Sequence, residues 1–157
     1  MDSQGNNVEF SSYLGQKHVV LVFTKGFAGG RLCPFCTTQT SRLVSNYKKF
    51  QELNTEVLVV YPGDRNYLNQ FISAATKTEK EQVDQVPFPV LLDEELKAVN
   101  YFNIASSLAH PSTFIIDMDG AVKLAYVGAD ETSDRPSVLA MLRILEQAEN
   151  ERLSGKP

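Results

Sequence analysis

The sequence predicts an α/β fold in which a mixed central β-sheet is covered by helices on both faces. Short apolar segments rich in β-branched residues alternate with longer segments whose apolar residues recur at helical spacing. The early apolar segments lack polar residues on either face, which is typical of strands buried on both sides of a sheet. A late Asp-Gly pair between two strand-like segments indicates a hairpin, which adds antiparallel strands to the same sheet.

Five segments are predicted to be strands. The first is the run VVLVF, and the second is ended by Pro62-Gly63. A helix between these two strands implies a parallel, right-handed crossover, while Asp119-Gly120 joins the last two strands as a hairpin. The predicted strands are residues 19–23, 57–61, 90–92, 111–117 and 121–127.

Four helices are predicted between and after these strands. The first follows a Cys-Pro-Phe-Cys motif and carries apolar residues at helical spacing as far as Leu53. Asp64 can cap the second, which runs to Ala75, and Pro136 can open the last. A short third helix is expected at 94–102, and the GFAGG segment before the cysteine motif is expected to interrupt regular structure. The apolar face predicted for the last helix comprises Val138, Leu139, Leu142, Leu145 and Ala148. This order of elements is the plan of a thioredoxin-like three-layer domain.

Composition limits the classes of protein to consider. The 157 residues are predicted to form one domain, because a chain of this length holds a single core. Its longest strongly apolar run is far too short to span a bilayer, and a net charge of −4 without a basic block argues against nucleic acid as a partner. The polar first ten residues lack a signal-peptide core, so we expect a cytoplasmic protein, or a periplasmic one if a leader has been removed.

The two cysteines, Cys33 and Cys36, lie where the first predicted strand leads into the first helix. Unpaired backbone N–H groups and the positive end of the helix dipole stabilise a thiolate at such a position. Thiols in Cys-X-X-Cys motifs at helix starts have pKa values of ~3.5–7.5, so they are largely ionised near neutral pH. We therefore assign Cys33 as the exposed, attacking thiol and Cys36, about one turn further on, as the more buried resolving thiol.

Two other interpretations of the cysteine pair stay open. A zinc site needs four ligands, and apart from the cysteines the chain offers only His18 and His110, without zinc-finger spacing. The cysteines could also be inert, small apolar residues of the core. We interpret His18 as a polar residue flanking the first strand rather than as a catalytic base, and we expect neither a cofactor nor a metal.

Five stretches occur in an order typical of one family and together cover nearly the whole chain. They are LGQKHVVLVFTKG, LCPFC, VPFPVLLDEELKAVNYF, HPSTFIIDMDGAV and, more loosely, VGADETSDRPS. On these motifs the chain resembles the thioredoxin-fold, peroxiredoxin-like alkyl hydroperoxide reductase/thiol-specific antioxidant (redoxin) family. The resemblance implies that Cys33 and Cys36 are the redox cysteines.

The resemblance also implies a substrate-binding region. Pro111 matches a proline that in thioredoxin-like folds is usually cis and packs against the dithiol; the alternative is an ordinary trans proline that opens a strand. The backbone at His110 and Ser112 would then help to hold a bound substrate strand. Pro34 and Phe35 of the cysteine motif are assigned to the same region.

The chain departs from the family pattern just before the cysteines. Peroxiredoxins typically have a proline seven residues, and a threonine or serine three residues, before the attacking cysteine, whereas this chain has Gly26 and Gly30. The usual downstream arginine is not evident, so Lys25, Arg31 or Arg42 is considered as a source of positive charge. These departures count against efficient peroxide reduction. They leave dithiol–disulfide exchange unaffected, because exchange needs only the thiolate and its resolving partner.

The sequence therefore predicts a thiol-based oxidoreductase whose Cys33–Cys36 pair cycles between dithiol and disulfide and reduces disulfides or peroxides in antioxidant defence. Its expected partners are a thiol reductant of thioredoxin or glutathione type and a disulfide or peroxide substrate, and the chain is expected to be a monomer or homodimer. The alternative is a redox-inert binding module on the same fold. That alternative is suggested by the missing hydroxyl and by aromatic residues that are expected to be exposed, such as Phe27 and Phe35.

Overall fold

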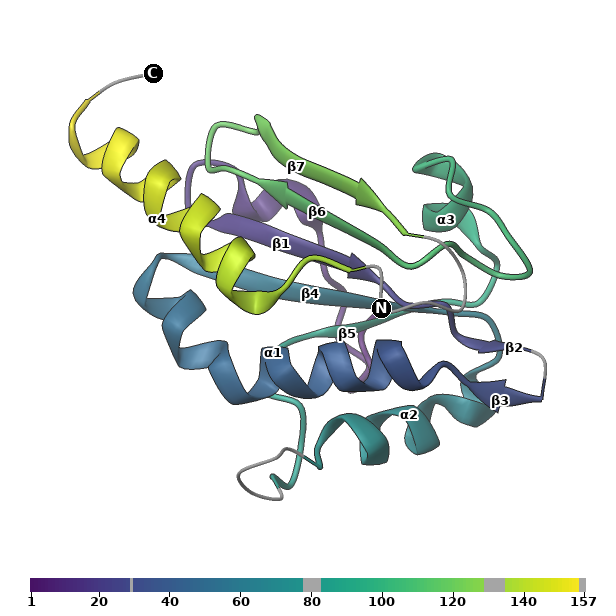
Figure 1. The fold of residues 1–157 in the computed structure, drawn as a ribbon. Helices are drawn as coiled ribbons and strands as arrows, with labels where there is room; N and C mark the ends of the chain where they lie inside the picture. Colours follow the sequence, from purple (N-terminus) through teal and green to yellow (C-terminus); the bar gives the residue numbers. More distant parts are fainter. Residues whose placement is uncertain (29, 78–82, 129–134, 156–157) are drawn as a thin grey trace.

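Five strands form the central sheet in the order β5-β4-β1-β6-β7 (Figure 1). The computed structural model describes residues 1–28, 30–77, 83–128 and 135–155. Strand β1 pairs in parallel with β4, and β4 pairs in parallel with β5, while β6 and β7 continue the sheet antiparallel to β1 and to each other. The predicted mixed sheet and the predicted hairpin are therefore confirmed. The strands are β1 (His18–Phe23), β4 (Thr55–Pro62), β5 (Val90–Asp93), β6 (Ser112–Ile116) and β7 (Val122–Val127).

Helices cover both faces of this sheet (Figure 1). Helices α1, α2 and α4 pack on one face, and α3 packs on the other face together with the short helix η1. None of the described helices combines the length and the hydrophobicity that crossing a bilayer requires. The helices are η1 (Phe10–Tyr13), α1 (Pro34–Glu52), η2 (Arg65–Tyr67), α2 (Leu68–Ala75), α3 (Lys97–Tyr101) and α4 (Val138–Leu153).

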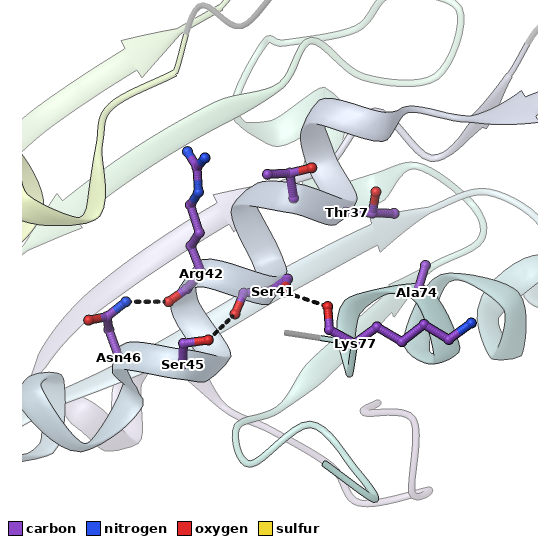
Figure 2. A pocket seen from close by; sticks show the side chains of 8 residues that line it. Thr37, Ser41, Arg42, Ser45, Asn46, Ala74 and Lys77 are labelled. Carbon is purple, nitrogen blue, oxygen red and sulfur yellow. Dashed lines mark hydrogen bonds between the residues drawn. The ribbon is translucent and has the colours of Figure 1, made fainter. Parts of the chain in front are cut away.

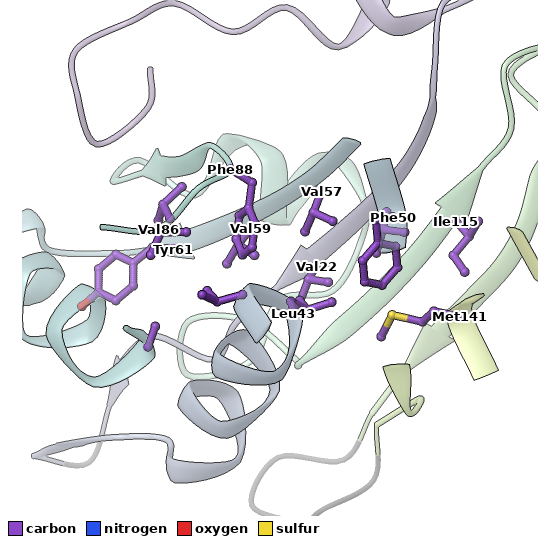
Figure 3. Close-up of a cluster of buried hydrophobic side chains, with 14 of the residues drawn as sticks. Val22, Leu43, Phe50, Val57, Val59, Tyr61, Val86, Phe88, Ile115 and Met141 are labelled. Carbon is purple, nitrogen blue, oxygen red and sulfur yellow. The ribbon is translucent and has the colours of Figure 1, made fainter. Parts of the chain in front are cut away.

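Strand β1 is buried along its whole length, as its uninterrupted apolar sequence predicts. Because side chains alternate across a strand, Val20 and Val22 join the core under α1 and α4, while Leu21 and Phe23 join the core under α3. Figure 3 shows the first of these cores, in which side chains from β1, β4, α1 and α4 meet. Two cores on opposite faces therefore hold β1 and β4 fixed, and with them the segment that follows β1.

Several local predictions differ from the structure. The glycine-rich segment after β1 forms a small hairpin, β2 (Phe27–Ala28) and β3 (Arg31–Leu32), rather than a plain interruption. Asp64 caps the 3-10 turn η2, accepting a hydrogen bond from the backbone of Asn66, and α2 follows that turn. The last helix is capped by Ser137 rather than opened by Pro136, because the Ser137 hydroxyl accepts the N–H of Ala140 at 3.1 Å.

One residue of the predicted α4 face is misplaced, since Leu139 is 59% exposed, whereas Leu142 and Leu145 are buried. Helix α3 is also shorter than the predicted 94–102. Residues 78–82, and residues 129–134 within the loosest matching motif, lie outside the described residues.

A buried polar cluster joins the start of β1 to α4, at the opposite end of β1 from the cysteines. His18 Nδ1 accepts the backbone N–H of Met118 at 3.1 Å, so Nε2 carries the proton and donates to Glu149 Oε1 at 2.7 Å. Glu149 also accepts two hydrogen bonds from Arg152 and one from Asn54. The hydrogen bonds from Arg152, and then those from His18 and Asn54, lower the pKa of Glu149 to about 2. His18 is thus a structural residue that helps to fix α4 against the sheet.

We predict that Glu149→Ala lowers the free energy of unfolding by about 2–3 kcal/mol, because it leaves a buried imidazole without its acceptor. Glu146→Ala on the exposed side of the same helix is the control and should change it by less than ~0.5 kcal/mol. Chemical denaturation measures the free energy of unfolding of both variants.

The depressed pKa of Glu149 adds stability that is complete above the ordinary carboxyl value of 4.5 and is lost as pH falls through about 2. The difference between wild type and Glu149→Gln should therefore shrink over that range, and a difference independent of pH would contradict the assignment.

Candidate active site

The two cysteines lie where the chain enters α1, at the end of the sheet reached by the carboxyl terminus of β1. Cys33 is the N-cap of α1 with extended backbone angles, φ −70° and ψ 116°, and Pro34 occupies the first helical turn. The backbone N–H of Thr37 donates to the Cys33 carbonyl at 3.2 Å and so forms the first turn of the helix. The predicted position of Cys33 at a helix start is therefore confirmed.

Both cysteines are free thiols, and both are largely buried. Cys33 is 8% exposed and Cys36 is 2% exposed. Cys36 is thus the more buried thiol, as predicted, but the expectation that Cys33 is an exposed thiol is wrong. The Arg135 side chain, described below, is one of the groups that contact its sulfur.

Arg135 lies against both sulfur atoms. Its Nη2 donates to Cys33 Sγ at 3.3 Å and to Cys36 Sγ at 3.1 Å, and its guanidinium sits 5.6 Å from the centre of the Phe35 ring. Cys36 Sγ also accepts the backbone N–H of Lys25 at 3.3 Å. Each sulfur atom therefore accepts at least one hydrogen bond from an N–H donor.

The sequence did not identify Arg135, and it proposed Lys25, Arg31 or Arg42 as the source of positive charge. Of these three, Lys25 contributes a backbone donor, while Arg31 lies on β3 and Arg42 lies on α1. The signal in the sequence is weak, because Arg135 is a single arginine just ahead of the α4 cap and about one hundred residues from the cysteines. Only the packing of α4 beside α1 brings it to the sulfurs.

The two thiols have opposite pKa shifts. The hydrogen bond from the Cys36 thiol, helped by backbone N–H groups and by the charge of Arg135, lowers the pKa of Cys33 to about 5 despite its burial. The pKa of Cys36 is raised, because its thiol donates to the Cys33 sulfur and because burial disfavours its thiolate. These shifts favour the thiolate at Cys33 and the thiol at Cys36 at neutral pH, and the attacking and resolving roles assigned to the two residues stay predictions.

The two glycines that replace the family's proline and hydroxyl residue have left-handed backbone conformations. Gly26 has a φ of +80°, and a Cβ there would lie 2.7 Å from the carbonyl oxygen of Pro62. Proline requires φ near −65°, so neither proline nor another side chain fits this position. Gly30 has a φ of +78° next to β3, a conformation that disfavours threonine or serine. Both departures therefore fall at positions whose backbone conformation in this chain favours glycine.

The prediction of a cis proline is wrong, because the peptide bond before Pro111 is trans. Pro111 opens β6, which is the alternative considered for it. The carbonyl of Pro111 already accepts the N–H of Gly128 at 2.7 Å, and the carbonyl of His110 accepts the hydroxyl of Ser112 at 2.9 Å. These residues lie at the same end of the sheet as the dithiol, since Ser112 pairs with Phe23 at the end of β1. Their role in holding a substrate stays a prediction.

The aromatic residues behind the binding-module alternative have different environments. Phe27 stacks on Tyr67 with ring centres 3.8 Å apart and is partly buried, so it anchors the hairpin to η2. Phe35 is 38% exposed beside Arg135. Within the described part of the chain, no three His, Cys, Asp or Glu side chains are grouped as metal ligands would be.

We predict that iodoacetamide alkylates Cys33 with a midpoint near pH 5, compared with ~8.5 for an ordinary thiol. Peptide mapping by mass spectrometry measures the rate at each pH. Arg135→Gln should move the midpoint upward because it removes a stabilising charge, whereas Arg143→Gln on the exposed side of α4 should not. A wild-type midpoint above pH 8 would show that Cys33 is not activated.

Comparison with known proteins supports the predicted resemblance. Residues 1–125 match the sequence model of the AhpC/TSA family. A peroxiredoxin of Nanoarchaeum equitans is 27% identical over 124 residues, which are 74% of this chain and 53% of the relative. An alkyl hydroperoxide reductase C of Staphylococcus aureus is 26% identical over 108 residues, which are 67% of this chain and 54% of the relative. The chain thus spans about half the length of these curated relatives.

Solved structures show the same fold. The mitochondrial 2-Cys peroxiredoxin from Plasmodium falciparum superposes with a TM-score of 0.76 and 26% identity, covering 97% of this chain and 87% of that one. A reduced 2-Cys peroxiredoxin from Plasmodium vivax, at 21% identity, resembles this chain in fold with a TM-score of 0.73, covering 93% of this chain and 85% of that one. The family match over most of the sequence and the shared thioredoxin-like, peroxiredoxin-type fold lead to one conclusion: the chain belongs to the AhpC/TSA family.

Proposed function

We propose that the protein is a thiol-based oxidoreductase whose Cys33–Cys36 pair cycles between dithiol and disulfide. The observation that carries this proposal is the contact of one guanidinium, that of Arg135, with both sulfur atoms. A cation in this position stabilises the attacking thiolate and stabilises the thiolate that leaves when the disulfide is reduced. An inert core pair would not require a cation in contact with both sulfur atoms.

Disulfide reduction follows directly from the two pKa shifts. The Cys33 thiolate attacks a substrate disulfide RSSR, forms a mixed disulfide and expels one thiolate. Cys36 then attacks the Cys33 sulfur, its proton passes to the second departing thiolate, and the Cys33–Cys36 disulfide forms. The substrate gains two electrons and two thiols leave. An external thiol reductant restores the dithiol.

Peroxide reduction uses the same residues and is supported by membership of the AhpC/TSA family. The Cys33 thiolate attacks the O–O bond, takes one oxygen as a sulfenic acid and releases an alkoxide that is protonated by solvent. The Cys36 thiol condenses with the sulfenic acid, giving the disulfide and water. The hydroxyl that many relatives place three residues before the cysteine is absent at Gly30, so Arg135 is the donor available to a bound peroxide.

The expected partners are a thiol reductant of thioredoxin or glutathione type and a disulfide or peroxide substrate. A reducing compartment such as the cytoplasm suits this cycle, because a dithiol must be regenerated there after each turnover. The octamer named for a Plasmodium yoelii relative is described as artifactual for that protein. A monomer or homodimer stays our expectation for this chain.

We predict that Cys33→Ser abolishes both insulin reduction and peroxide consumption, because no other thiolate starts the reaction. Cys36→Ser should keep the first step and stop the cycle, so that a mixed disulfide or a sulfenic acid accumulates on Cys33. Intact mass measurements after one equivalent of substrate detect that adduct. Comparing the insulin and peroxide rates of wild type shows which substrate class is preferred.

The competing proposal, a redox-inert binding module, predicts different results. Under it, both cysteine variants would behave as wild type, and Cys33 would react with iodoacetamide no faster than a free thiol. Retention of both activities in Cys33→Ser would show that Cys33 is not the nucleophile.

A further inference from the structure

The Cys36 sulfur accepts a hydrogen bond from a backbone segment that neighbouring parts of the chain hold in place. The donor is the N–H of Lys25, which lies 3.3 Å from Cys36 Sγ in the stretch between β1 and β2. A peptide N–H directed at sulfur stabilises the thiolate over the thiol. The Lys25 N–H therefore favours the form of Cys36 that attacks as the resolving thiol.

The exposed side of α1 takes no part in this contact. A hollow of about 270 Å³ lies there, between α1 and the end of α2 (Figure 2). Its wall includes Ser41, whose hydroxyl donates to the Lys77 carbonyl at 2.9 Å. The described residues that line this hollow do not include Cys33 or Cys36. The N–H that reaches the Cys36 sulfur comes instead from the buried side of the helix, where β1 ends.

One anchor of the donor segment is Thr24, the residue before Lys25. The backbone N–H of Thr24 donates to the Val60 carbonyl at 3.0 Å, and the Thr24 hydroxyl donates to the same oxygen at 3.1 Å. Val60 belongs to β4, which pairs with β1 in parallel. The sheet therefore fixes the chain on the amino-terminal side of the Lys25 N–H.

The other anchor is Gly26, which two other segments enclose. A Cβ on Gly26 would lie 2.7 Å from the Pro62 carbonyl oxygen and 2.9 Å from Leu108 Cδ1. Because a carbon–carbon bond is ~1.5 Å long, the Leu108 methyl lies within ~4.4 Å of the Gly26 Cα, which is van der Waals contact. A Cβ on Gly63 would lie 3.1 Å from the same methyl. The Leu108 side chain thus packs against the turns that follow both β1 and β4.

Leu108 is itself held by a closed loop between α3 and β6. The N–H of His110 donates to the Ile104 carbonyl at 2.8 Å, and Ala105 forms an antiparallel bridge with Ala109. Ile104 and Ala109 are buried in the core beneath α3. A chain of contacts therefore leads from that core through Leu108 to the backbone that bonds to the Cys36 sulfur.

We propose that Leu108 is a positioning residue: by packing on Gly26 it holds the Lys25 N–H on Cys36 Sγ, and so speeds the step in which Cys36 closes the disulfide. The inference rests on the proposed function and adds a residue to it. In this step Cys36 loses its proton to solvent and attacks the Cys33 sulfur of the mixed disulfide. The Cys33–Cys36 bond forms, and the substrate thiolate leaves with the electron pair of the broken S–S bond.

The preceding attack by Cys33 should not depend on Leu108. The Cys33 thiolate is stabilised by the hydrogen bond from the Cys36 thiol, by backbone N–H groups at the start of α1 and by the charge of Arg135. The Lys25 N–H donates to the other sulfur. A defect confined to closure therefore separates positioning by Leu108 from a general effect on the fold.

The test uses the reduced full chain and dithiobis(nitrobenzoate), an aromatic disulfide that releases one coloured thiolate in each step. Attack by Cys33 releases the first, at a rate proportional to the reagent concentration. Closure by Cys36 releases the second, at a rate independent of that concentration. Stopped-flow absorbance measures both rate constants, and Cys36→Ser, which should show the first release alone, assigns them.

We expect Leu108→Ala to lower the closure rate constant by ~3-fold and to leave the attack rate constant at its wild-type value. Weakening one hydrogen bond to sulfur raises the thiol pKa by about one unit, and a Brønsted slope of ~0.5 returns half of that loss as nucleophilicity. Leu108→Met has a similar side-chain volume and should restore closure. The control is Val19→Ala, which trims the core beneath α3 at the far end of β1 and should change neither rate constant.

A closure rate constant unchanged by Leu108→Ala, an equal fall in both rate constants, or an equal fall in closure in Val19→Ala overturns the inference while the proposed function stands. If Leu108→Ala does not fold, Leu108→Val provides the same comparison with a smaller truncation. A wild type that releases no second thiolate forms no Cys33–Cys36 disulfide, which overturns the proposed function and this inference with it.

Discussion

The Arg135 guanidinium contacts the sulfur atoms of Cys33 and Cys36 where the chain passes from β1 to α1. This contact depends on how the fold places the starts of α1 and α4 beside each other. Cys33 and Cys36 come from the start of α1, whereas Arg135 comes from the segment that leads into α4. The shared core beneath α1 and α4, where Leu43 and Phe50 meet Met141 and Leu145, sets the separation of the two helix starts. Packing between distant segments therefore brings a cation to thiols that the local sequence places at the start of α1, where its charge helps to lower the pKa of Cys33.

The features that the sequence predicted well are those determined by local pattern. The apolar run that became β1 needs no distant information, because a strand lacking polar residues must be buried on both faces. The Asp119-Gly120 turn likewise identified the β6–β7 hairpin. The Cys-Pro-Phe-Cys motif was likewise placed correctly at the start of a helix, with Cys36 the more buried thiol, while the redox role of the pair stays a prediction. The family resemblance was confirmed over most of the chain.

The features that the sequence missed depend on contacts between distant segments. Arg135 carries no local signal, and only tertiary packing brings it to sulfurs about one hundred residues earlier in the chain. Cys33, which was expected to be exposed, is buried, and the backbone at Gly26 and Gly30 has the left-handed conformation that favours glycine over the family's proline and hydroxyl residue. The trans bond before Pro111 is a departure that resemblance alone could not reveal. His18, an unremarkable polar residue in the sequence, ties β1 to α4 through Glu149.

We infer that Arg135 favours reversible disulfide formation between Cys33 and Cys36 by stabilising the Cys33 thiolate. The midpoint potential of the pair in glutathione buffers at pH 7, for wild type and Arg135→Gln, tests it most directly. Because a stabilised thiolate favours the dithiol form, the variant should be more reducing, by ~30 mV for each pKa unit that Arg135 contributes at Cys33. A pair that forms no disulfide at any glutathione ratio, or a potential unmoved by Arg135→Gln, would contradict the account.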